Sequence, residues 1–90
     1  MIDLKLIGFV ARAKRRKETL NLLSKHVQLS QPEIMRSLNQ YKSHNSATIK
    51  ELVQKDLIKC INPEDRSFKF YKITKKGRNT LKEVLKISGE

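Results

Sequence analysis

The sequence predicts a single, mainly α-helical domain that carries one small β-hairpin. Three observations lead to this fold class: a helix-start signal at Ser30, two β-prone runs within residues 58–73, and an amphipathic helix after Thr74. A chain of 90 residues buries only about 60 to 65% of its unfolded surface, which is enough for one core. We therefore expect residues 1–90 to form one domain.

Residues 2–26 are expected to form one long helix. Apolar residues recur at threes and fours along the segment, and a basic run at 12–17 interrupts its middle. Gly8 weakens this interpretation by about 1 kcal/mol relative to Ala, and the alternation of residues 2–6 would also suit a short strand. The conformation of the first ten residues therefore stays open. The apolar positions are Ile2, Leu6, Phe9, Val10, Ala13, Leu20, Leu23 and Val27.

A second helix is expected to begin at Gln31. Ser30 and Glu33 form a capping box, in which a hydroxyl and a carboxylate satisfy free backbone N–H groups. Pro32 falls in the first turn, where its missing N–H costs nothing. The polar run 39–46 then predicts an inter-helix turn. The buried face of this helix is expected to contain Ile34, Met35 and Leu38.

A third helix is expected at about residues 43–56. Its apolar side carries Ile49, Leu52 and Val53, and Leu57 and Ile58 follow at its exit. The opposite side is polar and free to meet a ligand. That polar face contains Ser43, Ser46, Ala47, Lys50 and Gln54.

The last third of the chain predicts a hairpin and a closing helix. The β-prone runs 58–61 and 68–73 are joined by residues 62–67, which are rich in turn formers. Alternation places Tyr71 and Ile73 on the inner face. Thr74 can then cap a helix that Gly89 ends, with Leu81, Val84, Leu85 and Ile87 as its apolar stripe.

The charge of the chain favours a polyanionic partner. The formal net charge of +11 suits nucleic acid or an anionic membrane. The longest apolar run, Leu6 to Ala11, is far shorter than the roughly 20 residues of a membrane-spanning helix. The N-terminal residues also lack the order of a signal peptide. We therefore expect no membrane partner and a cytoplasmic location.

The sequence offers no pattern for a metal ion, a cofactor or catalysis. Cys60 is alone, so no intrachain disulfide can form, and no Cys/His cluster has metal-ligand spacing. There is no glycine-rich phosphate loop and no nucleophile with a matched base. The neighbours Glu64 and Asp65 suit a turn. We expect a protein that is not an enzyme and that needs no cofactor.

Three helices, a hairpin and a closing helix in this order resemble the winged helix-turn-helix DNA-binding domain. The helix exit Leu57-Ile58 and the later run from Tyr71 through Thr74 to Gly77 look like the signature of that domain. More narrowly, residues 16–86 resemble small archaeal transcriptional regulators of the Sso10a-like type. The residues that carry this narrower resemblance are Ile34, Met35, Asn39, Ile49, Leu52, Val53, Lys55, Leu57 and Ile58.

The resemblance implies a homodimer that holds a recognition helix in the major groove and the wing, residues 58–73, on the minor groove or backbone. A terminal helix would join the subunits. The chain departs from the family in having a short closing helix. The apolar N-terminal extension, residues 1–11, would be exposed on a monomer, so we expect a dimer through residues 2–20 and the C-terminal helix. Further departures are Gln40 and Asn45, where apolar residues are usual, and Asp56, where Gly is common.

The same reasoning gives the residues expected to touch DNA. Short polar side chains near the start of a recognition helix read base edges, and an arginine at the wing tip, Arg66, suits a narrow minor groove. Neither Arg nor Asn stands on the outer helix face, so we expect modest or shape-based specificity. Base-facing candidates are Ser43, His44, Ser46, Ala47 and Lys50, with a solvated turn residue as the alternative for His44. Backbone candidates are Lys42, Arg12, Arg15, Arg16, Lys69, Lys72, Lys75 and Lys76.

The sequence therefore predicts a transcriptional regulator that binds double-stranded DNA and is associated with the nucleoid. The nearest alternative is a sequence-tolerant chromatin protein. A winged helix that binds RNA or another protein is also open, because a fold does not settle function. The operator, the direction of regulation and any effector ligand stay undetermined.

Overall fold

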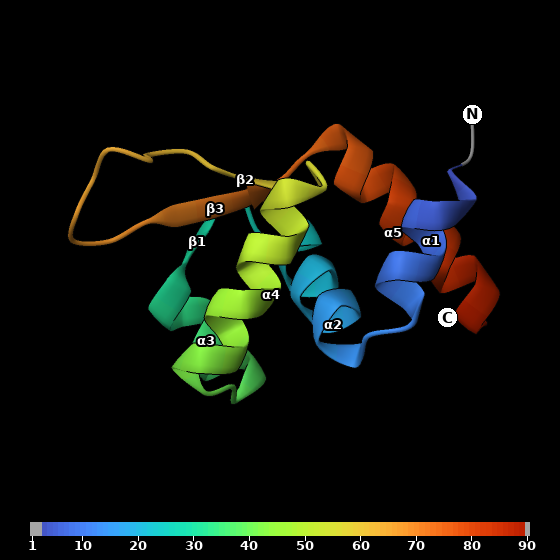
Figure 1. Cartoon of the computed structure of the whole chain (residues 1–90), viewed down its shortest axis with the longest axis horizontal. Helices are drawn as coiled ribbons and strands as arrows, with labels where there is room; N and C mark the ends of the chain where they lie inside the picture. The colour runs from blue at the N-terminus through green and yellow to red at the C-terminus, as the bar shows by residue number, and fades with distance from the viewer. Residues whose placement is uncertain (1–2, 90) are drawn as a thin grey trace.

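The computed structural model describes residues 3–89, which form five α-helices and three short strands in that range (Figure 1). The described chain measures 37 × 25 × 20 Å along its principal axes. The predicted fold class, mainly α-helical with a hairpin wing, is confirmed. In chain order the elements are α1 (Leu4–Ala11), α2 (Lys14–Ser24), β1 (Leu29–Ser30), α3 (Gln31–Leu38), α4 (Lys42–Gln54), β2 (Ile58–Cys60), β3 (Phe70–Ile73) and α5 (Lys75–Ser88).

The predicted single helix over residues 2–26 is wrong, because the chain breaks between α1 and α2. The Asp3 carboxylate starts α1 by accepting hydrogen bonds from two backbone N–H groups at 3.0 and 3.2 Å. Ala13 is extended, with φ −121° and ψ 111°. The break turns the chain, so that α1 and α2 both pack on α5 while α2 also packs on α4 and β3. Ile2 lies outside the described residues.

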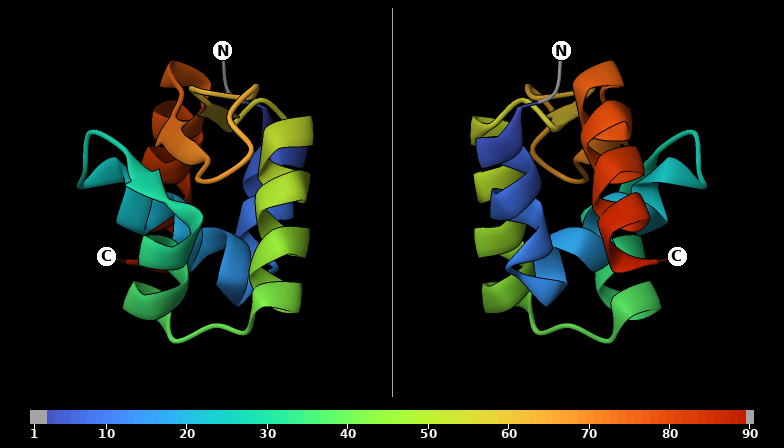
Figure 2. Two further views of the ribbon diagram at one scale, coloured as in Figure 1. Left: turned by 90° about the vertical axis from the view of Figure 1, so that its left-hand side faces the viewer. Right: turned by 90° about the vertical axis from the view of Figure 1, so that its right-hand side faces the viewer.

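The apolar face of α1 is covered by the chain itself. Leu6, Ile7 and Val10 are buried, and α1 lies along α5, as the right-hand view of Figure 2 shows. The sequence predicts an exposed patch on a monomer at Leu6, Phe9 and Val10 unless something covers them; the packing of α1 on α5 buries Leu6 and Val10 and leaves Phe9 half-buried. Leu4 alone among its large apolar residues stays mostly exposed, at 76%.

The helix start at Gln31 is confirmed. The backbone N–H of Glu33 donates to the Ser30 hydroxyl at 3.3 Å, and the backbone N–H of Ser30 donates to the Glu33 carboxylate at 2.9 Å. These bonds lower the pKa of Glu33. Ile34 is fully buried. The helix ends at Asn39 in the left-handed conformation, with φ 52°.

The turn between α3 and α4 is shorter than the polar run 39–46 suggests, because α4 already begins at Lys42. The reason lies in the buried face of α4, which includes two polar residues. Asn45 and Thr48 are buried together with Ile49 and Leu52, at helical spacing. Val53, predicted on the apolar side, is 40% exposed instead.

Asn45 is fully buried because it has a polar partner in the turn. Its amide Nδ2 donates to the Gln40 side-chain oxygen at 2.9 Å, and the Asn45 Oδ1 atom has no partner among the described residues. Gln40 and Asn45, the two positions where the family usually has apolar residues, thus form one hydrogen-bonded pair. A hydrogen-bonded pair occupies the space that two apolar side chains would fill.

The three strands form an antiparallel sheet in the order β1-β3-β2. The predicted hairpin is confirmed, with Ile58 opposite Ile73 and Cys60 opposite Tyr71. β1 was not predicted, because two residues show no periodicity. The burial of Tyr71 and Ile73 agrees with the predicted alternation.

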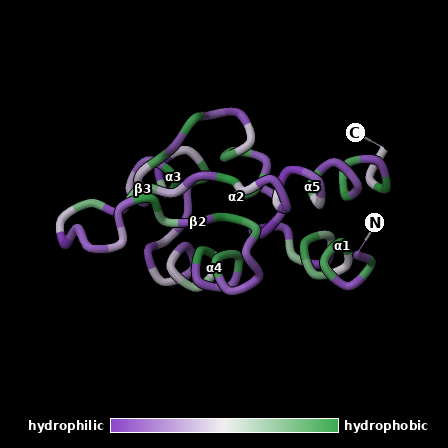
Figure 3. Tube along the Cα trace, turned by 90° about the horizontal axis from the view of Figure 1, so that it is seen from above, coloured by the Kyte–Doolittle hydropathy of each residue, from purple (hydrophilic) through white to green (hydrophobic). Residues whose placement is uncertain are grey.

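The loop of the wing, residues 61–69, extends beyond the helices (Figure 3). Asn62 closes its base: its amide donates to the Phe68 carbonyl at 2.7 Å and its side-chain oxygen accepts from the Phe70 N–H at 2.8 Å. Asp65 accepts from the hydroxyl and backbone N–H of Ser67 at 2.7 and 2.8 Å, which lowers the pKa of Asp65. The wing therefore has a defined shape.

The end of α4, the sheet and the start of α5 meet at the carbonyl oxygen of Leu57. It accepts a hydrogen bond from the Thr74 backbone N–H at 3.0 Å, and the Thr74 hydroxyl shares its proton between the Asp56 carbonyl at 2.7 Å and the Leu57 carbonyl at 3.1 Å. That hydroxyl in turn accepts from the Gly77 N–H at 2.9 Å and caps α5, as predicted. Asp56, just before this point, has φ 59°, the left-handed region that favours glycine. Ile87, predicted in the apolar stripe of α5, is 69% exposed.

Replacing Asp56 by Gly should stabilise the fold. The substitution removes the left-handed penalty of a residue with a Cβ and adds only the backbone entropy of Gly, so we expect a net gain of about 0.5 to 1 kcal/mol. That gain corresponds to a rise in Tm of roughly 2 to 8 °C. Thermal unfolding checks it. An unchanged or lower Tm would contradict the strain at this residue.

Replacing Gly77 by Ala should destabilise the fold by about 2 to 3 kcal/mol, the range for overpacking. A Cβ at this position would collide with the backbone carbonyl of Leu57 and press on the Ile73 side chain. Gly8→Ala is the matched control, because a Cβ there meets nothing within 4 Å and Ala favours a helix. Denaturant unfolding of both variants should give changes of opposite sign.

Candidate nucleic-acid interface

The outer face of α4 carries small and polar side chains that the core does not use. Ser43, Ala47, Lys50 and Gln54 are all exposed. At about 100° per residue they lie on the side opposite the buried stripe of Asn45, Ile49 and Leu52. This free polar face is the one that the sequence predicts.

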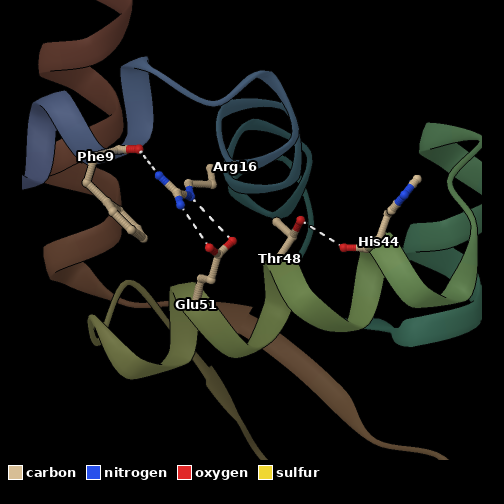
Figure 4. Close-up of polar contacts among 5 residues, drawn as sticks. All are labelled: Phe9, Arg16, His44, Thr48 and Glu51. Carbon is tan, nitrogen blue, oxygen red and sulfur yellow. Dashed lines mark hydrogen bonds and ion pairs between the residues drawn. The ribbon is translucent and has the colours of Figure 1, made fainter.

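His44 lies on a different side of α4 from the other base-facing candidates. Figure 4 shows it in line with Thr48 and Glu51, on the side of the helix that faces α2. Its backbone carbonyl accepts from the Thr48 hydroxyl at 3.0 Å, and its ring stands edge-on to the Tyr41 ring, with 6.0 Å between centroids. His44 therefore borders the outer face rather than standing at its centre.

A groove of about 710 Å³ lies between the wing, α3 and the start of α4. The left-hand view of Figure 2 looks onto this side of the molecule. The groove brings together the predicted contacts Lys42, from the start of α4, and Arg66 and Lys69, from the wing loop. Residues of the groove that were not among the predicted DNA contacts are Gln31, Pro32, Met35, Arg36, Ser67 and Phe68.

Ser46 connects this groove to the outer face of α4. Its hydroxyl accepts from the Gln31 side-chain amide at 2.9 Å. Gln31 and Arg36 lie at the start and on the exposed side of α3, next to the capping box. For Arg36 the signal that could have found it is its position opposite Ile34 on α3.

Arg16 does not belong to the exposed basic surface, contrary to its prediction as a backbone contact. Its guanidinium donates to both carboxylate oxygens of Glu51 at 2.8 and 3.4 Å and to the Phe9 carbonyl at 2.8 Å (Figure 4). It also lies 3.8 Å from the centre of the Phe9 ring. Arg16 thus ties α1, α2 and α4 together. The side-chain hydrogen bond from Arg16 lowers the pKa of Glu51.

The other predicted backbone contacts lie around α4 in different directions. Arg15 is beside the turn between α3 and α4, where it lines a hollow with Asn39 and Gln40. Lys76 lies near the other end of α4, next to Lys55. Arg12 is exposed at the junction of α1 and α2.

Lys72 and Lys75 lie away from the groove. They share a hollow with Lys59 and Arg78, next to the start of α5. Lys72 is on the sheet face opposite Tyr71 and Ile73, which are buried. Since α4 covers the buried side, Lys72 and Lys75 do not flank the outer face of α4 as the sequence suggested.

Residues 3–89 contain no group of three or more His, Cys, Asp or Glu side chains that could hold a metal ion. In the same residues, no helix has the length and apolar character needed to cross a membrane. Cys60 is a free cysteine, partly buried against the core. The arrangement that remains is a polar helix face beside a basic groove and a projecting wing.

A helix-turn-helix whose second helix presents a polar face, with a basic hairpin beside it, defines the class of winged-helix nucleic-acid-binding proteins. The model of the winged helix DNA-binding domain family matches residues 18–77. The chain belongs to that family. No curated protein sequence matches the chain.

Solved structures with the same fold include regulators of the MarR type. A cysteine-to-serine mutant of MarR from E. coli aligns with a TM-score of 0.80 and 16% identity over 98% of this chain and 68% of that one. The same mutant complexed with operator DNA aligns with a TM-score of 0.77 and 16% identity, over 94% and 64%. The adhesin competence repressor AdcR from Streptococcus pyogenes aligns with a TM-score of 0.71 and 19% identity, over 86% and 57%. These similarities show the fold, whereas the narrower Sso10a-like resemblance stays a prediction.

Replacing Glu51 by Gln should weaken the tie between α4 and α2 in a pH-dependent way. The lowered pKa of Glu51 means that the charged carboxylate stabilises the folded state above its unfolded value of 4.5 and that this contribution is lost as the pH falls through the folded value. Because the Glu51 side chain is 41% exposed, we expect about 0.5 to 1 kcal/mol at pH 7. The unfolding free energies of the variant and the parent should converge as the pH falls below the lowered pKa of Glu51 in the folded state.

Urea unfolding at pH 7 and pH 3 measures this convergence. Glu83→Gln is the control, because Glu83 forms its ion pair, at 3.5 Å, with Lys86 of the same helix, α5. That pair does not join α5 to another helix or strand. A gap between Glu51→Gln and the parent that is equally large at both pH values would contradict the role of the charged pair.

Proposed function

We propose that the chain is a transcriptional regulator that binds double-stranded DNA. The observation that carries this proposal is the placement of the exposed polar face of α4 beside the groove of Lys42, Arg66 and Lys69. α4 would enter the major groove, and the wing would contact the minor groove and backbone. The DNA-binding family and the likeness to MarR, one structure of which is complexed with operator DNA, support this function.

The proposed base-facing residues are Ser43, Ser46, Ala47 and Lys50, with His44 at their border. Ser46 is held by Gln31, so its position is fixed before binding. Lys42, Arg66 and Lys69, joined by Arg36, would hold phosphates. Arg12 and Arg15 would extend these contacts past the turn at residues 39–41, and Arg16 would position α4 without touching DNA.

We also propose that the chain acts as a homodimer through residues 2–20 and α5. The covered face of α1 no longer supports this, but Leu4 on α1 and Ile87 on α5 are 76% and 69% exposed, and these two helices pack on each other. A second copy that covers both would bury apolar surface. The proposed regulator has no catalytic role. Its proposed location is the cytoplasm, on the nucleoid.

A sequence-tolerant architectural protein is the second candidate. The outer face of α4 favours it, because Ser43, Ala47 and Lys50 supply few of the bidentate base contacts that are worth about 1 to 3 kcal/mol each. The two candidates differ in the ratio of specific to non-specific affinity rather than in the surface used.

The test is binding to random duplex DNA, to a selected DNA site and to duplex RNA across a salt series. A selected site bound at least about a thousandfold tighter than random duplex would establish a specific regulator. Equal, steeply salt-dependent binding to all DNA would establish the architectural protein. Preference for RNA, or no binding, would overturn the proposal.

Replacing Lys50 by Ala separates base reading from phosphate contact. If Lys50 reads a base, the affinity for the selected site should fall by about 1 to 3 kcal/mol while the affinity for random duplex changes little. Lys42→Ala is the matched comparison in the groove and should weaken both affinities alike, with the salt slope reduced by about 0.9. If Lys50→Ala, like Lys42→Ala, lowers the affinity for the selected site and for random duplex equally, Lys50 contacts the phosphate backbone and not a base.

A further inference from the structure

A second basic surface lies on the sheet face turned away from α4. Lys59 and Lys72 are directly opposite each other across β2 and β3, and both are exposed. The next pair in the register, Ile58 and Ile73, is buried on the other side. Because α2 and α4 contact the strands from that buried side, the two lysines point away from the outer face of α4. In Figure 1 these helices lie below the strands.

Two further cations complete what we call the sheet-face basic patch, formed by Lys59, Lys72, Lys75 and Arg78. These four side chains line one hollow of about 500 Å³, whose other lining residues are Val27, Ile73 and Thr74. No acidic residue lines it. Arg78 is held in place by a hydrogen bond from its Nη1 atom to the Ser24 carbonyl at 3.2 Å.

Nothing within the described chain balances this charge. Among residues 3–89 no carboxylate pairs with Lys59, Lys72 or Lys75 within 4.0 Å. Like charges that face each other across strands destabilise a sheet. The first turn of α5 adds Lys75 and Lys76 with no acidic residue, at the helix end where the dipole opposes cations. These four cations therefore do not stabilise the folded chain. They would stabilise a bound anionic ligand.

We propose that the sheet-face basic patch binds the phosphate backbone of a second DNA duplex while α4 and the wing hold the first. This rests on the proposed DNA-binding function and adds a second, sequence-independent contact on a separate face. Three of the four cations are lysines, which act as point charges on flexible stems and suit phosphates without demanding a fixed geometry. The chain would then join two duplexes.

An acidic protein fits the patch less well than DNA does. Protein interfaces depend on a buried apolar centre with aromatic anchors. The hollow has one strongly exposed apolar side chain, Val27 at 87%, and no aromatic residue among those that line it. A regular array of phosphates needs only the charges that are present.

Nuclear magnetic resonance of the whole isotope-labelled chain, titrated with a random 15-base-pair duplex, gives a residue-resolved test. Amide signals of α4 and of the wing loop, residues 61–69, should shift in a first phase. Signals of Lys59, Lys72, Lys75 and Arg78 should shift in a second, weaker phase at excess duplex, with its own steep salt dependence.

The double substitution Lys59→Gln and Lys72→Gln should weaken the second phase at least about tenfold, since each lysine lost removes a phosphate contact, and leave the first phase unchanged. The matched control, Lys25→Gln with Lys55→Gln, also removes two exposed lysines but lies outside the patch, the groove and the proposed dimer surface, and should leave both phases intact. The amide spectrum of each variant, recorded without DNA, reports whether it is folded.

The outcomes separate this proposal from the DNA-binding function. Shifts on α4 and the wing without any on the patch would overturn the second surface alone. Patch signals that move together with those of α4 in one phase would also overturn it, because one duplex would then touch both faces. Tighter binding of polyglutamate than of DNA at the patch would point to a protein partner and overturn it. No shift on α4 or the wing would overturn the DNA-binding function itself.

Discussion

The carbonyl oxygen of Leu57 fixes the relation between the reading helix, the wing and the closing helix. It accepts from the backbone and the hydroxyl of Thr74, and the turn before it needs the left-handed Asp56. Gly77 is required because α5 passes too close to this carbonyl for any Cβ. The direction of the wing relative to α4 therefore follows from contacts among four residues that lie outside the proposed DNA-binding surface.

A second constraint acts at the opposite side of α4. The guanidinium of Arg16 holds the Glu51 carboxylate and the Phe9 carbonyl at once, so α1, α2 and α4 share one polar node. Three hydrogen bonds to one planar cation give orientation as well as energy. With Leu57 at its exit and Arg16 on its flank, α4 can leave its outer face to solvent without losing its position.

The sequence predicted the parts of the fold that depend on local chemistry. The capping box at Ser30, the Thr74 cap and the helix end at Gly89 each involve residues within a few positions of one another, so their patterns can be read directly. The family signature at Leu57 and Gly77 also corresponds to a physical contact. The break at Ala13 could not be predicted, because it depends on how both α1 and α2 pack on α5, which lies more than 60 residues later in the chain. β1 could not be predicted for a related reason, because these two residues form a strand only by pairing with β3.

The errors in the predicted site have a common cause. Periodicity says which residues face away from an apolar stripe, but Asn45 and Thr48 show that a buried stripe can be polar when a partner such as Gln40 is supplied by a turn. For a basic residue, the sequence predicts only that the side chain is exposed, and not which group it contacts. It could not show that Arg16 would face inward to Glu51.

Two groups of cations lie on different faces of the molecule. Lys42, Arg66 and Lys69 meet in the groove beside α4, whereas Lys59, Lys72, Lys75 and Arg78 meet across the sheet. The β pleat sets the direction of Lys59 and Lys72, since neighbouring residues of a strand point to opposite sides. Lys72 therefore has to face away from the core that Tyr71 and Ile73 enter. α4 packs on that core from the opposite side of the sheet. A cation on the outer face of β2 or β3 therefore cannot contact a ligand that is bound to the outer face of α4.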